Sequence, residues 1–577
     1  MTKLLMTALL LTQTLPAGYW PLEKSQPLIE KTQTITLSPD LSKLTDGEKK
    51  AVAKLIEVGR IFQKLYEEQR HPEALSSYRA LEQLDKQTGS TPATQNLLTL
   101  YRLFQGPIAT TLDNKREPFL PVEPTKPGKN VYPWGITREA VDQTRADLLH
   151  LRTVVRRMTS LSHDIEMLKR YPALMTLHSK LLRELETPRP AGNALYAAPY
   201  SVAYADDLMR AYKLLNEAAD AVEKDDDEFA RFLRNRARDL LSNDYESGDA
   251  SWVTGRFKNL NAQIGSYETY DDELFGVKTF FSFCLLQSRP QETAALRQAM
   301  KGIQALEDSL PYKHHKKVRE DIPVGVYDVV ADFGQSRGGN TATILPNESY
   351  LARRYGRTIL LRANIMRDPS IFEGTSRTFA AAVGEEQAKA LTPDGNFYRT
   401  LWHEVGHYLG VDRAGDGREL DEALQDNANT LEEMKADLVS LFVAQALHKQ
   451  GYYTDAQLRS VYAGGILRVL QNNRPRRDQP YNTMQLMQWN FYLENGLLSF
   501  DPATKTLRIN YDKYHEVVGK MLERVLAVQY AGSKAESDKF IDQYTNWDEN
   551  LHGAVAANIR AQQKYRFRVF KYAALGE

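Results

Sequence analysis

A chain of 577 residues exceeds what a single hydrophobic core usually supports, so two or more lobes are expected. Its composition, 42% hydrophobic and 26% charged, is that of a globular protein, and its formal net charge is zero. This neutral balance gives no electrostatic reason to expect nucleic acid or an anionic membrane as the main partner. A single cysteine, Cys284, excludes an intrachain disulfide and a metal site built from cysteines.

The N-terminal residues carry the pattern of a targeting segment. A lysine, Lys3, precedes the apolar run 4–11, and small residues follow it. That layout is typical of a secretory signal, and the run is too short to span a bilayer as a helix. We therefore expect residues 1–18 to be a signal peptide. The mature protein would be exported, periplasmic or extracellular, with no stable membrane association; the alternative is a frayed apolar helix on a cytoplasmic protein.

Helical periodicity dominates the part of the chain that follows. It runs through residues 45–105 and again through about 136–245. Between them, the segment 106–135 contains six prolines, which exclude a helix interior and predict an extended crossing on the surface. We therefore expect helices on both sides of one irregular connection.

The segment 260–365 has a different character. Short stretches such as "IPVGVYDVVADFG", "NTATILPN" and "RTILLRANI" are rich in β-forming residues and are separated by Gly, Pro and Asn. They predict the strands of a small sheet or barrel. From about residue 380 to 540 the pattern is helical again. The chain as a whole is thus predicted to be mostly helical, with one β-containing part.

The stretch "TLWHEVGHYLGVD", residues 400–412, places two histidines four residues apart. On a helix His403 and His407 share one face and can direct two imidazoles at one metal ion. Glu404 lies about 100° further round the helix and can reach a water on that ion without occupying it. Gly410 is well placed to end the helix. The pattern predicts a zinc site.

Catalytic zinc needs a third protein ligand and an open fourth position. Candidates follow in "NANTLEEMKADLVSLF", where Asn429 or Thr430 can cap a new helix. Glu433 and Asp437 are again four residues apart, so one can bind the metal while the other accepts the N–H of a ligating histidine. The alternative is that these acids only favour the positive end of the helix dipole. Two such helices in succession favour the metal site.

Further stretches along the chain include "FQGPIATTLDNKREPF", "KNVYPWGITREAVD", "IGSYETYDDELFGVKTFF", "ILPNESYLARRYG" and "WNFYLENGLLSFD". Together with the histidine motif, they resemble the dipeptidyl-peptidase III family of zinc peptidases. The chain looks closest to the bacterial and plant relatives that carry the five-residue H-E-x-x-H motif. The resemblance covers nearly the whole chain after the signal segment.

The resemblance implies an α+β fold, mostly α, with two lobes around a wide cleft. One lobe would be helical and bear one Zn²⁺ per chain, and the other would contain a small β-barrel core. In residue ranges, we expect N-terminal helices and the barrel-containing lobe at 19–365. The helical catalytic lobe would follow at 366–545, and a C-terminal segment at 546–577.

The resemblance also implies roles for the residues of the two helices. His403, His407 and Glu433 look like the zinc ligands. Glu404 looks like the general base, and Glu432 and Asp437 look like acids that orient the histidines.

Outside the two helices, the sequence matches the family at some positions and departs from it at others. Tyr267 is similar to a tyrosine that hydrogen-bonds the tetrahedral intermediate, and Asn347 to a contact with the substrate backbone. Tyr481 stands where many relatives have a histidine that helps to stabilise the transition state. Gly265 stands where the well-studied dipeptidases have an acid that holds the free amine of the peptide. Glu268 is the candidate to replace that acid.

These features predict a zinc-dependent hydrolase of peptides, in which Glu404 activates a zinc-bound water for attack on the scissile amide. Three alternatives stay open: an oligopeptidase without an N-terminal dipeptide register, another zinc amide hydrolase, and an inactive peptide-binding relative. An intact Glu404 argues against the last, because binding alone needs no base. The sequence carries no signal for an oligomeric state.

Overall fold

The computed structural model of the protein describes residues 15–143, 152–188, 194–319, 322–346, 349–470 and 480–577. Their contacts divide the chain into two compact units. Unit 1 comprises residues 1–285, 330–339 and 565–577, and unit 2 comprises residues 286–329 and 340–564.

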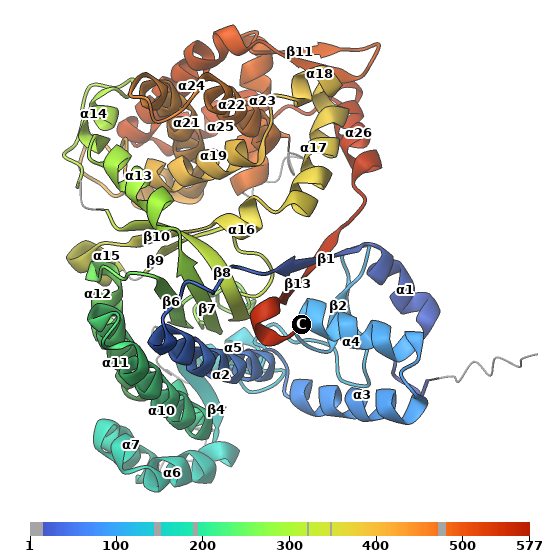
Figure 1. Ribbon diagram of the computed structural model, residues 1–577, viewed down its shortest axis with the longest axis vertical. Coiled ribbons are helices and arrows are strands. Elements are labelled where there is room, and N and C mark those ends of the chain that lie inside the picture. The colour runs from blue at the N-terminus through green and yellow to red at the C-terminus, as the bar shows by residue number, and fades with distance from the viewer. Residues whose placement is uncertain (1–14, 144–151, 189–193, 320–321, 347–348, 471–479) are drawn as a thin grey trace, which may run out of the picture. The chain divides into compact units, whose positions relative to one another are not determined.

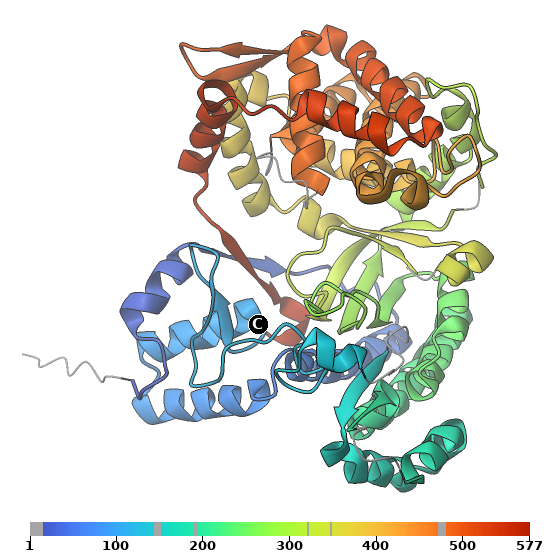
Figure 2. The ribbon, with the colours of Figure 1, turned by 180° about the vertical axis from the view of Figure 1, so that it is seen from behind.

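This division differs from the expected residue ranges. The first lobe was expected to run to residue 365, but residues 286–329 and 340–365 belong to unit 2. The last residues return to unit 1 because β13 (Phe567–Tyr572) pairs in parallel with β1 (Thr32–Leu37), as Figure 2 shows. Local periodicity carries no trace of a pairing between the two ends of a chain.

Long amphipathic helices make up much of unit 1. α2 (Asp46–Arg70) begins at a capping box, in which the side chains of Thr45 and Glu48 each accept the other's backbone N–H. Its apolar stripe packs against α10 (Ala205–Val222), which also packs against α11 (Asp227–Ser242) (Figure 1). The helical prediction for residues 45–105 is confirmed.

The stretch 136–245 was predicted to be helical, and the structure adds a two-stranded sheet to it. β4 (Thr153–Arg157) pairs antiparallel with β5 (Leu195–Pro199). Both strands are short, and the two lie far apart in the sequence. The helical periodicity of the residues around them therefore gives no indication of either strand. The remaining elements of unit 1 are α1 (Leu22–Glu30), α3 (Ala74–Thr88), α4 (Pro92–Phe104), β2 (Ile108–Thr110), β3 (Arg116–Pro118), α5 (Arg138–Asp142), α6 (Leu161–Arg170), α7 (Pro172–Leu177), α8 (Ser179–Glu186), α9 (Tyr200–Ala203) and α12 (Glu246–Thr254).

Five strands from the segment 260–365 form one sheet, as predicted. Their order is β6 (Leu260–Ser266), β7 (Phe281–Ser288), β8 (Val324–Gly334), β10 (Thr358–Arg362) and β9 (Ala342–Leu345). β10 pairs in parallel with β8 and antiparallel with β9. Most of these strands are buried along their length, which explains their near-continuous apolar runs. Among the described strands, β6 and β9 stand at the two ends of this order.

Helices dominate unit 2, as predicted for residues 380–540. Four of them, α19 (Pro393–Gly406), α21 (Ala428–Lys449), α22 (Asp455–Val469) and α24 (Tyr514–Ala531), pack around one large apolar cluster that includes Trp402 (Figure 1). The other elements are α13 (Pro290–Met300), α14 (Ile303–Asp308), α15 (Ser349–Tyr355), α16 (Ala363–Met366), α17 (Pro369–Val383), α18 (Glu385–Ala388), α20 (Leu420–Leu424), α23 (Pro480–Glu494), β11 (Leu498–Asp501), β12 (Thr506–Ile509), α25 (Lys534–Tyr544) and α26 (Ala554–Gln562).

Most of the expected signal peptide, residues 1–14, lies outside the described residues. Among the helices that the structure describes, none is both long and apolar enough to cross a membrane.

Candidate metal centre

The helix that carries the two histidines, α19, ends earlier than the sequence suggested. Gly410 was expected to end it, but the regular helix stops at Gly406. His407 follows with a helical backbone (φ −63°, ψ −23°), and its N–H still bonds the carbonyl of His403 at 3.3 Å. The two imidazoles therefore keep their i, i+4 relation. Gly410 turns the chain away at φ +77°, and its N–H donates to the buried carboxylate of Glu307 at 2.7 Å.

The second helix, α21, begins slightly before the predicted cap. Asn429 and Thr430 lie within the helix, because a 3₁₀ turn (Gln425–Asn427) leads straight into Ala428. Asn427 takes the N-cap position, but its side-chain amide donates to Ser537 and Asp538 on α25 at 2.8 Å instead of accepting a backbone N–H. Tertiary contacts have replaced the expected local cap.

The close approach of α19 to α21 depends on a residue without a side chain. A Cβ atom at Gly406 would lie 2.8 Å from the backbone oxygen of Ala436, closer than real carbon atoms approach. Glycine at this position therefore lets the histidine-bearing helix meet the acidic helix. On the same helix, the apolar side chains of Leu401, Trp402 and Val405 are fully buried and hold α19 in the core.

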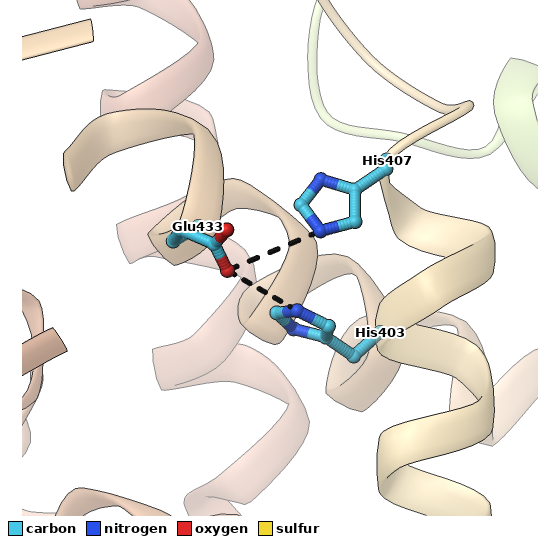
Figure 3. Close-up of side chains that lie close together, drawn as sticks. All are labelled: His403, His407 and Glu433. Carbon is cyan, nitrogen blue, oxygen red and sulfur yellow. Dashed lines mark ion pairs between the residues drawn. The ribbon is translucent and has the colours of Figure 1, made fainter. Parts of the chain in front are cut away.

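Two imidazoles and one carboxylate converge between these helices (Figure 3). The Oε2 atom of Glu433 lies 3.3 Å from Nε2 of His403 and 3.9 Å from Nε2 of His407. One ligand atom from each residue lies within 4.8 Å of the others. Oε2 of Glu433 is also buried without a hydrogen-bond partner among the described residues, an arrangement that leaves an acceptor for a cation. Two nitrogens and one oxygen fit the donor set of a catalytic zinc site.

The other nitrogen of each imidazole is held by a carboxylate. Nδ1 of His403 lies 2.7 Å from Oδ1 of Asp437, and Nδ1 of His407 lies 3.0 Å from Oε1 of Glu432. An Nδ1–H donated to a carboxylate leaves the Nε2 lone pair free for a metal. Glu432 and Asp437 thus each lie beside one of the two histidines.

Three basic residues that sequence reasoning missed support these acids. Arg399 donates to Oδ1 of Asp437 at 2.8 Å, and Nε of Arg468 lies 3.4 Å from its Oδ2. Nζ of Lys435, buried to 1% exposure, lies 2.9 Å from Oε1 of Glu432. Arg399 is one helical turn before His403, a spacing that could have indicated it. Arg468 lies on α22, and nothing local to it points to the cluster.

The charges around the cluster keep its acids ionised. Burial alone would raise the pKa of Asp437, but the charges of Arg468, His403 and Arg399 hold that pKa far below its usual range. For Glu432, the charge of Lys435 and the hydrogen bond from His407 outweigh burial and lower the pKa to about 2. Burial would lower the pKa of His403, but Asp437 raises it to about 9. The acids that hold the histidines therefore stay ionised despite their burial.

Glu404 is half-buried beside the cluster. No hydrogen bond or ion pair joins its carboxylate to another described residue. It is thus available to accept a proton, unlike the acids that hold the histidines.

Tyr481, at the start of α23, lies against the cluster. The residue is 42% exposed, and its ring faces the guanidinium of Arg468, 4.9 Å from the ring centre. Its pKa is raised first by burial and then by the charge of Glu433. Tyr481 thus lies beside the basic residue that supports Asp437.

Tyr267 belongs to unit 1 and is engaged there. Its ring is buried, and its hydroxyl donates to Oδ1 of Asp249 at 2.7 Å, which also accepts from Arg236 at 2.5 Å. A Cβ atom at Gly265 would lie 2.7 Å from the ring of Tyr245 and 2.8 Å from that of Tyr267. The packing of these two tyrosines explains why no acid stands at Gly265.

Of the two predicted substrate contacts, only Glu268 is among the described residues. Glu268 is half-buried in the irregular stretch after β6, where its backbone oxygen accepts the N–H of Phe280 at 3.2 Å. Asn347 lies outside the described residues.

Comparison with known proteins identifies the fold. No family model matches the chain. The structure is similar to that of DPP III from Caldithrix abyssi, with a TM-score of 0.79 and 22% identity over 95% of this chain and 99% of that one. It is also similar to dipeptidyl-peptidase III from Corallococcus sp. strain EGB, with a TM-score of 0.73 and 22% identity over 97% and 98% of the two chains. The chain therefore has the dipeptidyl-peptidase III fold along nearly its whole length.

A curated protein matches part of the sequence. Nudix hydrolase 3 of Arabidopsis thaliana is 26% identical over 358 residues, which make up 61% of this chain and 46% of that protein. The matched part is thus less than half of the curated relative's length.

Proposed function

We propose that the protein is a zinc-dependent peptidase that resembles dipeptidyl-peptidase III in activity as well as in fold. The observation that carries this proposal is the convergence of three candidate ligand atoms: the buried Oε2 of Glu433 lies 3.3 Å from Nε2 of His403 and 3.9 Å from Nε2 of His407. Two imidazoles and one carboxylate around one point form a donor set that suits Zn²⁺. The fold shared with two dipeptidyl-peptidase III structures supports a peptide as the substrate.

The chain's own residues supply the acid–base steps. A zinc ion bound to the three ligands would polarise the scissile carbonyl and bring the pKa of a water toward neutrality. Glu404 accepts the proton of the attacking water and then delivers it to the leaving amine. Asp437 and Glu432 keep the two histidines in the tautomer that presents Nε2.

Two tyrosines are proposed to donate to the developing oxyanion. The ring of Tyr481 already lies against Arg468, whose Nε is 3.4 Å from Asp437. Tyr267 would have to exchange its hydrogen bond to Asp249 for one to the substrate. One well-placed donor of this kind is worth about 3 kcal/mol of transition-state stabilisation.

The register of cleavage is a further proposal. Release of N-terminal dipeptides requires an anchor for the free amine, and a buried ammonium needs a carboxylate or several acceptors. No side chain fits at Gly265, so we propose Glu268 as that anchor and Asn347 as a contact to the substrate backbone. N-acetylation of the substrate should then abolish cleavage. Equal rates on acetylated and free forms of one hexapeptide would indicate an oligopeptidase instead.

The partial match to Nudix hydrolase 3 does not favour a different chemistry at this site. It covers less than half of that protein. The described cluster offers two imidazoles and one carboxylate, with a second carboxylate left free as a base. That set is typical of zinc hydrolases that act on amides.

The decisive experiment couples metal analysis to mass spectrometry of peptide digests. The purified protein should contain zinc and cleave peptides, and a chelator should abolish cleavage reversibly. Glu404→Gln should keep the metal but lower kcat by a factor of about 1,000 or more, because it removes the general base. Substantial residual turnover in that variant would overturn the assignment of Glu404, and absence of cleavage in the zinc-loaded wild type would overturn the proposed activity.

A further inference from the structure

The turn that follows the histidine motif is held by a carboxylate from a distant part of unit 2. Glu307, on α14, is fully buried. Its Oε2 accepts the backbone N–H of Gly410 at 2.7 Å, from a residue 103 positions further along the chain. Its Oε1 accepts the hydroxyl of Tyr312 and the backbone N–H of Lys316, the latter at 3.3 Å. One side chain thus joins the segment 307–316 to the turn after the motif.

The contacts of Glu307 are those that a buried carboxylate requires. A carboxylate removed from water is costly unless donors reach its oxygens, and here each oxygen has at least one. Hydrogen bonds to an ionised acceptor are roughly twice as strong as those between neutral groups. A second contact links the same two segments, since Nζ of Lys316 lies 3.1 Å from Oδ2 of Asp412. Gly410 is therefore held more firmly than an ordinary turn residue.

The position of His407 depends on this turn. The regular part of α19 stops at Gly406, so His407 lies at the end of the helix, where a backbone frays unless it is held. The N–H groups of Tyr408 and Leu409 bond to carbonyls only three residues back, at 2.9 and 3.1 Å, which tightens the last turn. Gly410 comes next, with φ +77°. The bond to Glu307 thus fixes the chain three residues after a candidate ligand.

A second path leads from the turn to the same imidazole. A Cβ atom at Gly410 would lie 3.1 Å from Cδ of Lys435, so the turn packs directly against the buried stem of that lysine. Nζ of Lys435 lies 2.9 Å from Oε1 of Glu432, and the same oxygen lies 3.0 Å from Nδ1 of His407. A displaced turn would therefore disturb the acid that orients His407 as well as the backbone that carries it.

We propose that Glu307 is a positioning residue for the candidate metal centre. By fixing the turn 408–412, it holds His407 in the orientation that presents Nε2 toward Glu433. The proposal rests on the proposed zinc site and deepens it, because it makes the affinity for zinc depend on a residue outside the two helices that carry the candidate ligands.

Hydrogen exchange in the metal-free, full-length protein tests the effect on the turn. Glu307→Ala leaves the N–H of Gly410 without its acceptor, so exchange in the segment 408–412 should be about tenfold faster or more. Glu307→Gln, which keeps one acceptor oxygen, should fall between this variant and the wild type. Mass spectrometry of the exchanged protein gives the rates. Unchanged exchange in an intact Glu307→Ala protein overturns the proposal.

Glu48→Ala is the matched control for both measurements. Glu48 is also a buried acid whose carboxylate accepts a backbone N–H, but it lies in the capping box of α2, in unit 1. Its loss should lower the stability of the fold and leave exchange in the segment 408–412 unchanged. The control thus separates general destabilisation from a specific effect on the turn.

Zinc competition with a chelator on the same proteins tests the effect on the metal centre. Glu307→Ala should weaken zinc binding about tenfold or more, Glu307→Gln less, and Glu48→Ala not at all. Thermal unfolding shows which variants are intact. Wild-type zinc affinity in an intact Glu307→Ala protein overturns the proposal, and so does an equal loss of affinity in Glu48→Ala. If Glu307→Ala does not fold, Glu307→Gln is judged by the same outcomes.

These results are distinct from those that test the proposed function, because neither measurement needs a substrate. A protein that binds zinc through Glu307-dependent contacts but cleaves no peptide keeps the positioning role and loses the peptidase. A protein that cleaves peptides, but whose zinc affinity does not respond to Glu307→Ala, keeps the peptidase and loses the positioning role.

Discussion

Unit 1 and unit 2 each bury a carboxylate that is bound by arginine, but the two carboxylates hold different rings. In unit 2, Asp437 accepts from Arg399 and orients the imidazole of His403. In unit 1, Asp249 accepts from Arg236 and from the hydroxyl of a tyrosine. The surroundings are alike, since both carboxylates are almost wholly buried.

The two rings differ in the polar atoms that remain once each ring is bound to its carboxylate. The tyrosine of unit 1, Tyr267, uses its only proton on the carboxylate, and the bound phenol presents no second polar atom. His403 uses Nδ1 on the carboxylate and still presents Nε2. A buried acid therefore orients a candidate metal ligand in one unit and holds the hydroxyl of a tyrosine in the other.

Removal of the third ligand should have the largest effect, and it should affect only unit 2. Glu433→Ala leaves two imidazoles without the carboxylate, so we expect the affinity for zinc to fall by more than about 100-fold, beyond the effect of an outer-sphere residue. Activity should fall to background. Measurement of bound zinc by competition with a chelator tests this, with Glu422→Ala, an exposed acid of α20, as the control. Wild-type zinc affinity in Glu433→Ala would contradict the assigned ligand set.

Neutralisation of each buried carboxylate compares the two networks directly. Asp437→Asn should destabilise the protein by roughly 3–5 kcal/mol, because it leaves the buried guanidinium of Arg399 without an ionised partner. Asp249→Asn should cost less, because Arg236 keeps its ion pair with Asp239. Only Asp437→Asn should also weaken zinc binding, by about 10–100-fold. Denaturant unfolding and zinc competition on the same preparations separate the two effects. Equal loss of zinc in both variants would show that the networks do not differ as described.

The two tyrosines should respond differently to loss of the hydroxyl. Tyr481→Phe should lower kcat about 100-fold through loss of a transition-state donor, with little change in stability. Tyr267→Phe should also lower kcat, because its hydroxyl is the second proposed donor, and it should lower the free energy of unfolding by about 1 kcal/mol, because it removes a hydrogen bond to Asp249. Steady-state kinetics and thermal unfolding provide both readouts. An unchanged kcat for Tyr267→Phe would show that Tyr267 stays on Asp249 during catalysis and takes no part in the reaction.

A methyl group between the two metal-binding helices should have the smallest effect. Gly406→Ala forces α19 away from α21 and should cost roughly 1–3 kcal/mol of stability, with a modest loss of zinc affinity. Gly374→Ala in α17 is the matched control, because a Cβ there meets nothing within 4 Å. It should be neutral or slightly stabilising. Similar unfolding midpoints for the two variants would argue against close helix packing at Gly406.

The side chains of the candidate metal centre could be singled out because their signals are local. His403 and His407 are one helical turn apart, and so are Glu433 and Asp437, so a regular helix alone places each pair on one face. The supporting basic residues were harder to find. Arg468 reaches Asp437 from a separate helix, and no spacing in the sequence links them.

The sequence by itself determined the helical character of most of the chain, the strands of segment 260–365, and the side chains able to bind zinc. All of these depend on periodicities of two to four residues, which backbone geometry imposes within one element. Tertiary structure decided what depends on distant partners. Pairing of β13 with β1 set the ends of the units, and α25 replaced the expected cap of α21. Packing around Gly265 left no room for an acid, since the space at one residue is fixed by side chains that other segments contribute.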